Sequence, residues 1–176
     1  MNLLHEYPLG DEAPKSFNVI IEIAKGSGNK YELDKKTGLI KLDRVFRTAQ
    51  VMPFDYGFAP QTWWHDGDPL DVMVLTTYPL MPGVVVEVRP VGIMEMNDSG
   101  EVDHKIIAVP VDDARWDNTK DINDVNEHFK KEVTHFYETY KMLQNKVVKV
   151  GEWKDRAAAE AAVVEAQALY KKEFSK

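Results

Sequence analysis

The segment Asp66-Gly67-Asp68-Pro69-Leu70-Asp71-Val72 leads into an apolar run that ends near Thr76. Its glycine and proline favour a tight turn, so the three carboxylates stay together instead of spreading along a helix face. Clustered carboxylates repel one another unless a cation neutralises them, and hard oxygen ligands suit magnesium, manganese or calcium. The segment therefore predicts a strand over Leu70–Thr76 whose start forms the floor of a divalent-metal site.

Two other interpretations of this segment are weaker. A turn with incidental charge would leave three carboxylates unpaired beside an apolar strand, which is costly. An EF-hand loop needs glycine at its sixth position, glutamate at its twelfth and a helix on each side, and the segment has none of these.

Further short strands are expected on both sides of this segment, because β-branched and alternating stretches are separated by Gly, Pro, Asn or Asp. They lie near Phe17–Ile23, Lys30–Leu33, Leu39–Leu42, Val51–Phe58, Val84–Met96 and Lys105–Val109. Many short strands with turn residues between them predict a small closed β-barrel rather than a parallel sheet.

The C-terminal third of the chain predicts helices. Asp124-Val125-Asn126-Glu127 resembles a capping box with Asp in place of Ser or Thr. Apolar residues follow at helical spacing: Val125, Phe129, Val133, Phe136, Tyr137 and Tyr140. A second, alanine-rich helix is predicted from about Arg156 to Phe174. The expected class is mainly β with packing helices (α+β).

Length and composition limit the possibilities. A chain of 176 residues is expected to form one domain, residues 1–176, with a sizeable core. No apolar stretch is long enough for a membrane span, and residues 1–6 lack the features of a signal peptide. The absence of cysteine excludes disulfides and thiolate metal sites. We therefore expect a cytoplasmic protein that does not contact a membrane.

The charge balance argues against broad nucleic-acid binding. The formal net charge is −7, with 29 acidic and 22 basic residues, whereas phosphate backbones require a positive face. A small anionic substrate remains compatible, because it can arrive as its magnesium complex or meet a local basic wall.

Several other polar residues allow two interpretations. Asp98 and Asp103 flank a Ser-Gly turn and belong either to a solvated hairpin, the commoner case, or to one barrel mouth. Glu22 lies in an apolar register and faces either solvent, again the commoner case, or a site. Lys30 and Glu32, two apart on one strand, are expected on the same face.

Other residues are taken individually as structural. Tyr56 and Tyr140 fit core-edge rings, and Lys30, Arg44 and Lys141 fit surface charges. His65 has no second histidine at a useful spacing and is expected to be a loop residue. The pair Trp63-Trp64 is either a stacking platform or, more commonly, packing or a subunit contact. For His135 and the last helix, subunit contact and ordinary helix surface or core remain open.

Together these residues resemble the soluble family I inorganic pyrophosphatases. The heptad at 66–72 matches the family signature over its full length, and other segments match in order over approximately Phe17 to Trp153. They include Val19-Ile20-Ile21-Glu22-Ile23, Lys30-Tyr31-Glu32-Leu33-Asp34, Asp43-Arg44, Asp55-Tyr56-Gly57, Tyr78-Pro79-Leu80-Met81-Pro82-Gly83, Arg89-Pro90-Val91-Gly92, Asp98 through Lys105, Ala108-Val109-Pro110 and His135-Phe136-Tyr137-Glu138-Thr139-Tyr140-Lys141.

The resemblance implies a five-stranded OB-type closed barrel with two C-terminal helices and a magnesium-dependent inorganic diphosphatase in the cytoplasm. Several Mg²⁺ ions per site are implied, with Mn²⁺ or other divalent ions as substitutes. The substrate would be magnesium diphosphate. The bacterial relatives imply a homo-oligomer, a hexamer.

The resemblance also implies a role for each site residue. Asp66, Asp71 and Asp103 would be direct metal ligands, Asp98 and Glu32 would hold further substrate-borne metal, and Glu22 would act through water. Asp68 would be the general base for the attacking water. The phosphates would be bound by Lys30, Arg44, Tyr56, Lys105, Tyr140 and Lys141.

One position departs from the family pattern. Met52 stands where the family usually has a tyrosine, and a thioether cannot donate the phenol's hydrogen bond.

Two alternative functions remain. A nucleoside polyphosphate hydrolase would use the same chemistry but needs a base pocket, for which Trp63-Trp64 is the candidate. A non-catalytic OB-fold nucleic-acid binder conflicts with the acidic balance.

Overall fold

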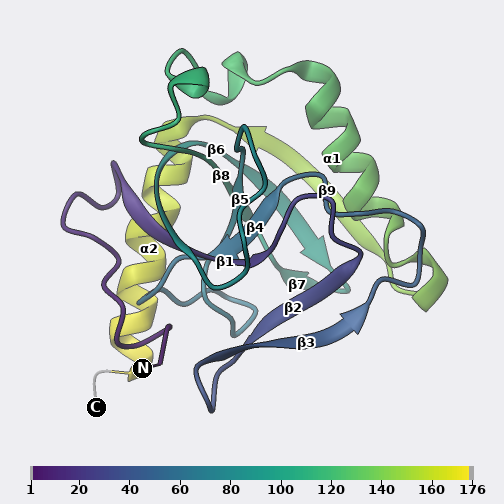
Figure 1. The fold of residues 1–176 in the computed structure, drawn as a ribbon, viewed down its shortest axis with the longest axis horizontal. Coiled ribbons are helices and arrows are strands. Elements are labelled where there is room, and N and C mark those ends of the chain that lie inside the picture. The colour runs from purple at the N-terminus through teal and green to yellow at the C-terminus, as the bar shows by residue number, and fades with distance from the viewer. Residues whose placement is uncertain (1, 175–176) are drawn as a thin grey trace.

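The computed structural model describes residues 2–174. Five of its strands close into a ring at the centre of the molecule (Figure 1). In ring order they are β1 (Phe17–Ile23), β4 (Asp55–Phe58), β5 (Asp71–Val74), β8 (Lys105–Pro110) and β6 (Val85–Asp98). Because β6 pairs back onto β1, none of the five leaves an open edge. The predicted α+β class and OB-like closed barrel are confirmed.

The strand β6 is the longest of the ring, and a register shift lies between Pro90 and Gly92. Proline cannot donate a ladder hydrogen bond, which explains its place at an irregularity. A Cβ on Gly92 would lie 2.7 Å from the Lys154 carbonyl oxygen, so the close approach of β9 (Val148–Lys154) requires glycine there. The two-residue strand β7 (Glu101–Val102) pairs with the far end of β6.

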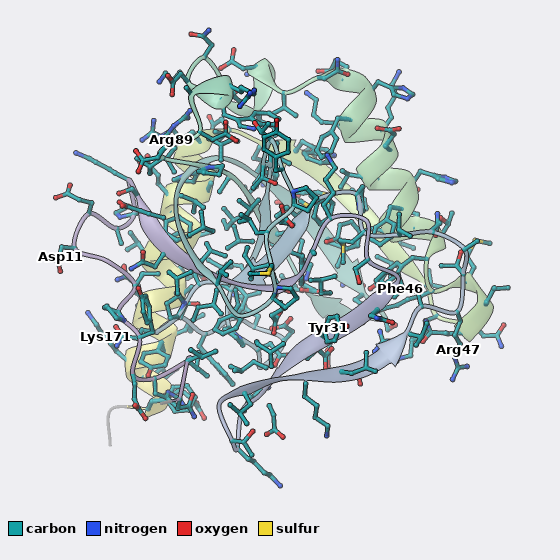
Figure 2. All side chains as sticks on the ribbon, viewed as in Figure 1. Asp11, Tyr31, Phe46, Arg47, Arg89 and Lys171 are labelled. Atoms are coloured by element: carbon teal, nitrogen blue, oxygen red, sulfur yellow. The ribbon has the colours of Figure 1, made fainter. Side chains whose placement is uncertain are left out.

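A separate hairpin of β2 (Asn29–Asp34) and β3 (Leu39–Val45) projects from the barrel (Figure 1). Tyr31 and Phe46, both labelled in Figure 2, pack with the core cluster that also contains residues of α1. The hairpin is thereby fixed over one end of the ring.

Two long helices lie on different sides of the barrel (Figure 1): α1 (Glu127–Thr139) and α2 (Arg156–Phe174). The helix α2 begins and ends where the alanine-rich pattern predicts. Its buried residues recur three and four apart and pack on the barrel: Ala159, Ala162, Val163 and Ala166. Short 3₁₀ turns occupy Ala114–Trp116 (η1), Ile122–Asp124 (η2) and Met142–Gln144 (η3).

Some local predictions are wrong. The expected cap of α1 at Asp124 is replaced by Asn126, whose side chain accepts from the backbone N–H of His128 at 2.8 Å. The Asp124 carboxylate instead accepts from the N–H groups of Lys120 and Asp121 and closes a capping box on η2. The strand expected over Val51–Phe58 is limited to β4, and β9 was not expected.

Within residues 2–174, no helix combines the length and the apolar character needed to cross a membrane.

Candidate active site

A cavity of about 360 Å³ lies at one end of the barrel, beneath the β2–β3 hairpin and beside the end of α1. Small-molecule sites typically fall in the range of about 300–1,000 Å³. With the exception of Arg44, the residues that the sequence analysis assigns to the site all line this cavity. They are Glu22, Lys30, Glu32, Tyr56, Asp66, Asp68, Asp71, Asp98, Asp103, Lys105, Tyr140 and Lys141.

Three carboxylates meet on the cavity floor. Asp66 lies in the turn before β5, Asp71 begins β5, and Asp103 precedes β8. One oxygen from each lies within 4.8 Å of the others. The parallel pairing of β5 with β8 brings the heptad beside the 98–103 segment, so the solvated-hairpin interpretation of Asp98 and Asp103 is wrong.

Lys105 is the cation embedded in this floor. It pairs with both Asp71 and Asp103, and its side chain is only 3% exposed. Burial opposes the charged ammonium, but the two carboxylates keep the Lys105 pKa above its ordinary value. Burial likewise raises the pKa of Asp71, against the opposing effect of Lys105. One lysine therefore compensates only part of the charge of three acids.

The turn that carries Asp66 and Asp68 is ordered by its own backbone. Gly67 has φ +80°, a conformation that glycine adopts without steric cost. The Asp68 N–H donates to the Asp66 carboxylate at 3.1 Å, and the Asp68 carbonyl accepts from Trp64 N–H at 2.7 Å. Burial, then Asp71 and Asp103, raise the pKa of Asp66 to about 7. An added cation would relieve this repulsion.

Glu22 reaches the cavity because β1 is irregular at that position. The pairing of β1 with β4 shifts register between Ile21 and Ile23, and such shifts re-aim side chains. The Glu22 carboxylate is buried and accepts from Leu33 N–H at 2.6 Å, so the solvent-face interpretation is wrong. Burial and the neighbouring Asp71 raise the pKa of Glu22 to about 8.

The hairpin contributes Lys30 and Glu32 from above the floor. The two side chains form an ion pair and both line the cavity, which confirms the prediction that they share a face. Arg44 lies opposite Lys30 in the β2–β3 ladder. Its guanidinium pairs with Asp43, its neighbour in sequence, and it does not line the cavity.

The remaining wall comes from the end of β6 and the end of α1. Lys141 pairs with Asp98, and Lys141 is buried rather than the surface charge its sequence position alone would suggest. Tyr56 and Tyr140 are buried as well, and burial raises both phenol pKa values, that of Tyr140 to about 12. Both phenols therefore stay protonated and can donate hydrogen bonds at neutral pH.

Two sequence features lie outside the cavity. His65 contacts Glu165 at 2.9 Å on α2, in agreement with its expected role as a loop residue. Trp64 is buried in the core, and the rings of Trp63 and Phe174 form a T-shaped pair with 5.0 Å between their centroids. The packing interpretation of this pair is confirmed, and neither indole is offered to a base in the cavity.

Sequence reasoning missed several cavity residues, among them Lys35 and Tyr137. Lys35 follows β2 in a turn and gave no signal beyond a surface charge. Tyr137 belongs to the apolar stripe of α1, yet its buried hydroxyl has no hydrogen-bond partner among residues 2–174, and burial raises its pKa. Met52 is buried and lines the cavity, so the departure from the family pattern is at the site itself.

The donor set fits a divalent cation. Acidic side chains outnumber lysines around the cavity, and the Asp66, Asp71 and Asp103 oxygens lie close enough to share one ion. Carboxylate-only sets favour magnesium, manganese or calcium over softer metals.

Comparison with known proteins agrees with this geometry. A family model described as inorganic pyrophosphatase matches residues 19–171. The chain belongs to the inorganic pyrophosphatase family. An inorganic pyrophosphatase of Thermus thermophilus is 53% identical over 171 residues, which cover 96% of this chain and 98% of that protein.

A solved structure and a plant member of the family are also similar to this chain. The crystal structure of the Thermus thermophilus enzyme superposes with a TM-score of 0.94 at 52% identity, covering 97% of this chain and 99% of that one. Soluble inorganic pyrophosphatase 3 of Arabidopsis thaliana is 46% identical, over 94% of this chain and 77% of its own length.

Proposed function

We propose that this protein is an inorganic diphosphatase that hydrolyses diphosphate to two phosphates. The observation that carries the proposal is the cavity in which Asp66, Asp71 and Asp103 meet within 4.8 Å, with lysines on the surrounding walls. Hydrolysis of a phosphoanhydride requires neutralisation of a highly charged anion, a positioned water and a stabilised leaving phosphate. The cavity offers groups for all three, and the family to which the chain belongs is named for this activity.

Magnesium is the proposed cofactor, with several ions per site and manganese as a possible substitute. Asp66, Asp71 and Asp103 would ligate it directly, and Asp98 and Glu32 would hold further ions that arrive with the substrate. Glu22 would hold a water of the ion. A divalent cation bound there would neutralise phosphate oxygens and acidify the attacking water.

The protein's own residues would supply the rest of the reaction. Asp68 lies on the floor beside the three ligands and would accept the proton of the attacking water. Lys30, Lys105 and Lys141 would bind phosphate oxygens, and the protonated phenols of Tyr56 and Tyr140 would donate hydrogen bonds to them. Charge that develops on the leaving phosphate would thereby be balanced by groups already in place.

Arg44 is the last member of the proposed phosphate-binding set, and its side chain would have to move before it could bind a phosphate. Its guanidinium would have to exchange Asp43 for a phosphate oxygen. Because Arg44 lies opposite Lys30 in the same ladder, rotation of its side chain would bring the guanidinium toward the cavity.

The proposal extends to the whole protein. Residues 1–176 would form a single domain and act in the cytoplasm as a homo-oligomer, a hexamer by family resemblance, without binding nucleic acid or membranes. Several apolar side chains are exposed, among them Tyr78 (71%) and Met81 (72%). Such exposed apolar residues support the proposal of a subunit interface. Light scattering on the purified protein measures the assembly.

The deciding experiment is phosphate release from diphosphate with magnesium, repeated with EDTA and with ATP as substrate. We expect rapid release that EDTA abolishes, and slow release from ATP because no indole lines the cavity to receive a base. Folded protein that releases no phosphate from diphosphate in ample magnesium would refute the proposal. Faster release from ATP would favour a nucleoside polyphosphate hydrolase.

A further inference from the structure

Lys35 connects the β2–β3 hairpin to the turn that carries Asp68. Its ammonium forms an ion pair with the Asp68 carboxylate and donates a hydrogen bond to the Gly67 carbonyl at 2.8 Å. It also lies 5.1 Å from the centre of the Trp63 ring, within the range of a cation–π contact. Lys35 thus has three partners in the segment 63–68, although it belongs to a different part of the fold.

The Asp68 side chain depends on this contact for its orientation. Its backbone is fixed by the bonds to Asp66 and Trp64, but the carboxylate is 53% exposed. Lys35 is its side-chain ion-pair partner among the described residues 2–174. An exposed carboxylate without such a contact samples several rotamers, whereas a general base must lie within hydrogen-bond reach of one water.

Trp63 gives Lys35 a rigid support. The ring of Phe174, on α2, packs against the Trp63 ring in a T-shaped pair, with 5.0 Å between centroids. The Lys35 ammonium is therefore held by the barrel side of the molecule while its backbone belongs to the hairpin.

We infer that Lys35 is a positioning residue for the hydrolytic reaction. It holds the Asp68 carboxylate in the arrangement that the reaction requires before substrate binds. The inference rests on the proposed function, because it assigns to Lys35 an action through the proposed base.

The first test compares Lys35→Met and Lys35→Arg with Lys36→Met as the matched control. Lys36 is the exposed neighbour in the same turn and does not line the cavity. We expect Lys35→Met to lower kcat about tenfold, the scale of a small misplacement of a reacting group, with KM nearly unchanged. Lys35→Arg should recover part of kcat, and Lys36→Met should resemble the parent.

Folding should be unaffected in these variants, because exposed ion pairs contribute little to stability. Unchanged melting temperatures would show that a loss of kcat is not partial unfolding. Equal losses in Lys35→Met and Lys36→Met, or a change in KM alone, would overturn the inference.

A double variant tests whether Lys35 acts through Asp68. If it does, Lys35→Met should cost nothing further in an Asp68→Asn background, since the group it positions is already lost. A full tenfold loss in that background would show that Lys35 acts independently and would contradict the inference.

Hydrogen exchange separates this inference from the proposed function. Lys35→Met should speed amide exchange in peptides covering residues 66–68, while Lys36→Met should not. This comparison requires no turnover, so it remains decisive if the parent protein fails to hydrolyse diphosphate. Unchanged exchange in Lys35→Met would overturn the positioning role.

Discussion

Asp71 and Lys105 lie directly opposite each other where β5 and β8 pair in parallel, and their side chains form an ion pair. The Asp71 side chain is 16% exposed and that of Lys105 is 3% exposed. This pair places a fixed positive charge beside a floor that still carries an excess of carboxylates.

Asp68→Asn should remove most turnover, by about 10²–10⁴-fold, because the amide keeps the shape of the side chain but cannot accept a proton as a base. Magnesium binding, measured by calorimetry, should remain close to that of the parent. Activity near the parent level would remove Asp68 from the role of base.

Asp71→Asn should weaken magnesium binding at least about tenfold, because a carboxylate oxygen of the proposed ligand set is lost. The measurement is the magnesium dependence of both phosphate release and melting temperature, since a ligand that binds only the folded state raises the latter. Asp11→Asn is the control, because Asp11 is exposed before β1 (Figure 2). An unchanged magnesium dependence in Asp71→Asn would contradict the metal assignment.

Gly57→Ala should destabilise the barrel by about 3 kcal/mol, at the upper end of typical overpacking costs. A Cβ on Gly57 would lie 2.0 Å from the Ile20 carbonyl oxygen, so β4 and β1 would have to separate beside Tyr56. Gly28→Ala is the matched control, because a Cβ there meets nothing within 4 Å. Urea unfolding should show a lower midpoint for Gly57→Ala alone, and equal midpoints would refute this account.

Asp121→Asn should destabilise the protein by about 0.3–1 kcal/mol at neutral pH, because the amide oxygen can still accept the hydrogen bonds but the negative charge at the start of α2 is lost. The Asp121 carboxylate accepts from Arg156 N–H at 3.0 Å, at the start of α2, and from Asn123 N–H at 3.2 Å in η2. The bond from Arg156, followed by those from Asn123, holds the pKa of Asp121 below its ordinary value.

The sign of the pH dependence follows from this lowered pKa. The charged carboxylate contributes stability above the unfolded-state pKa of about 4, and this contribution is lost as pH falls through the lower folded-state pKa. The difference between parent and Asp121→Asn should therefore shrink in acid, measured by urea unfolding at several pH values. The exposed Asp112 provides the control variant Asp112→Asn. A difference that grows in acid would contradict the assignment.

Local patterns predicted much of the scaffold. The alanine-rich stretch predicted α2 with its observed bounds because Ala159, Ala162, Val163 and Ala166 repeat at the helical period. The cap of α1 was misplaced because Asp124 and Asn126 are both good capping residues, and the choice between them depends on the neighbouring turn η2.

For the candidate site, the sequence predicted some residues correctly and could not place others. Glu22 could not be placed from periodicity, because a register shift in β1 turns it inward. Lys35 gave no signal at all, since its partners at 63–68 lie far along the chain. The family resemblance predicted the other site residues, and the folded chain places them around one cavity.

The sequence by itself determined the chemistry available to this protein: the acidic turn at 66–72, the short strands and the amphipathic helices all follow from local residue types. Only the tertiary structure decided which charges meet. Asp71 and Lys105 become neighbours through a parallel strand pairing, and Lys35 reaches Asp68 through the placement of a hairpin. The physical reason is that backbone propensities act over a few residues, whereas electrostatic contacts depend on distances set by the packed core.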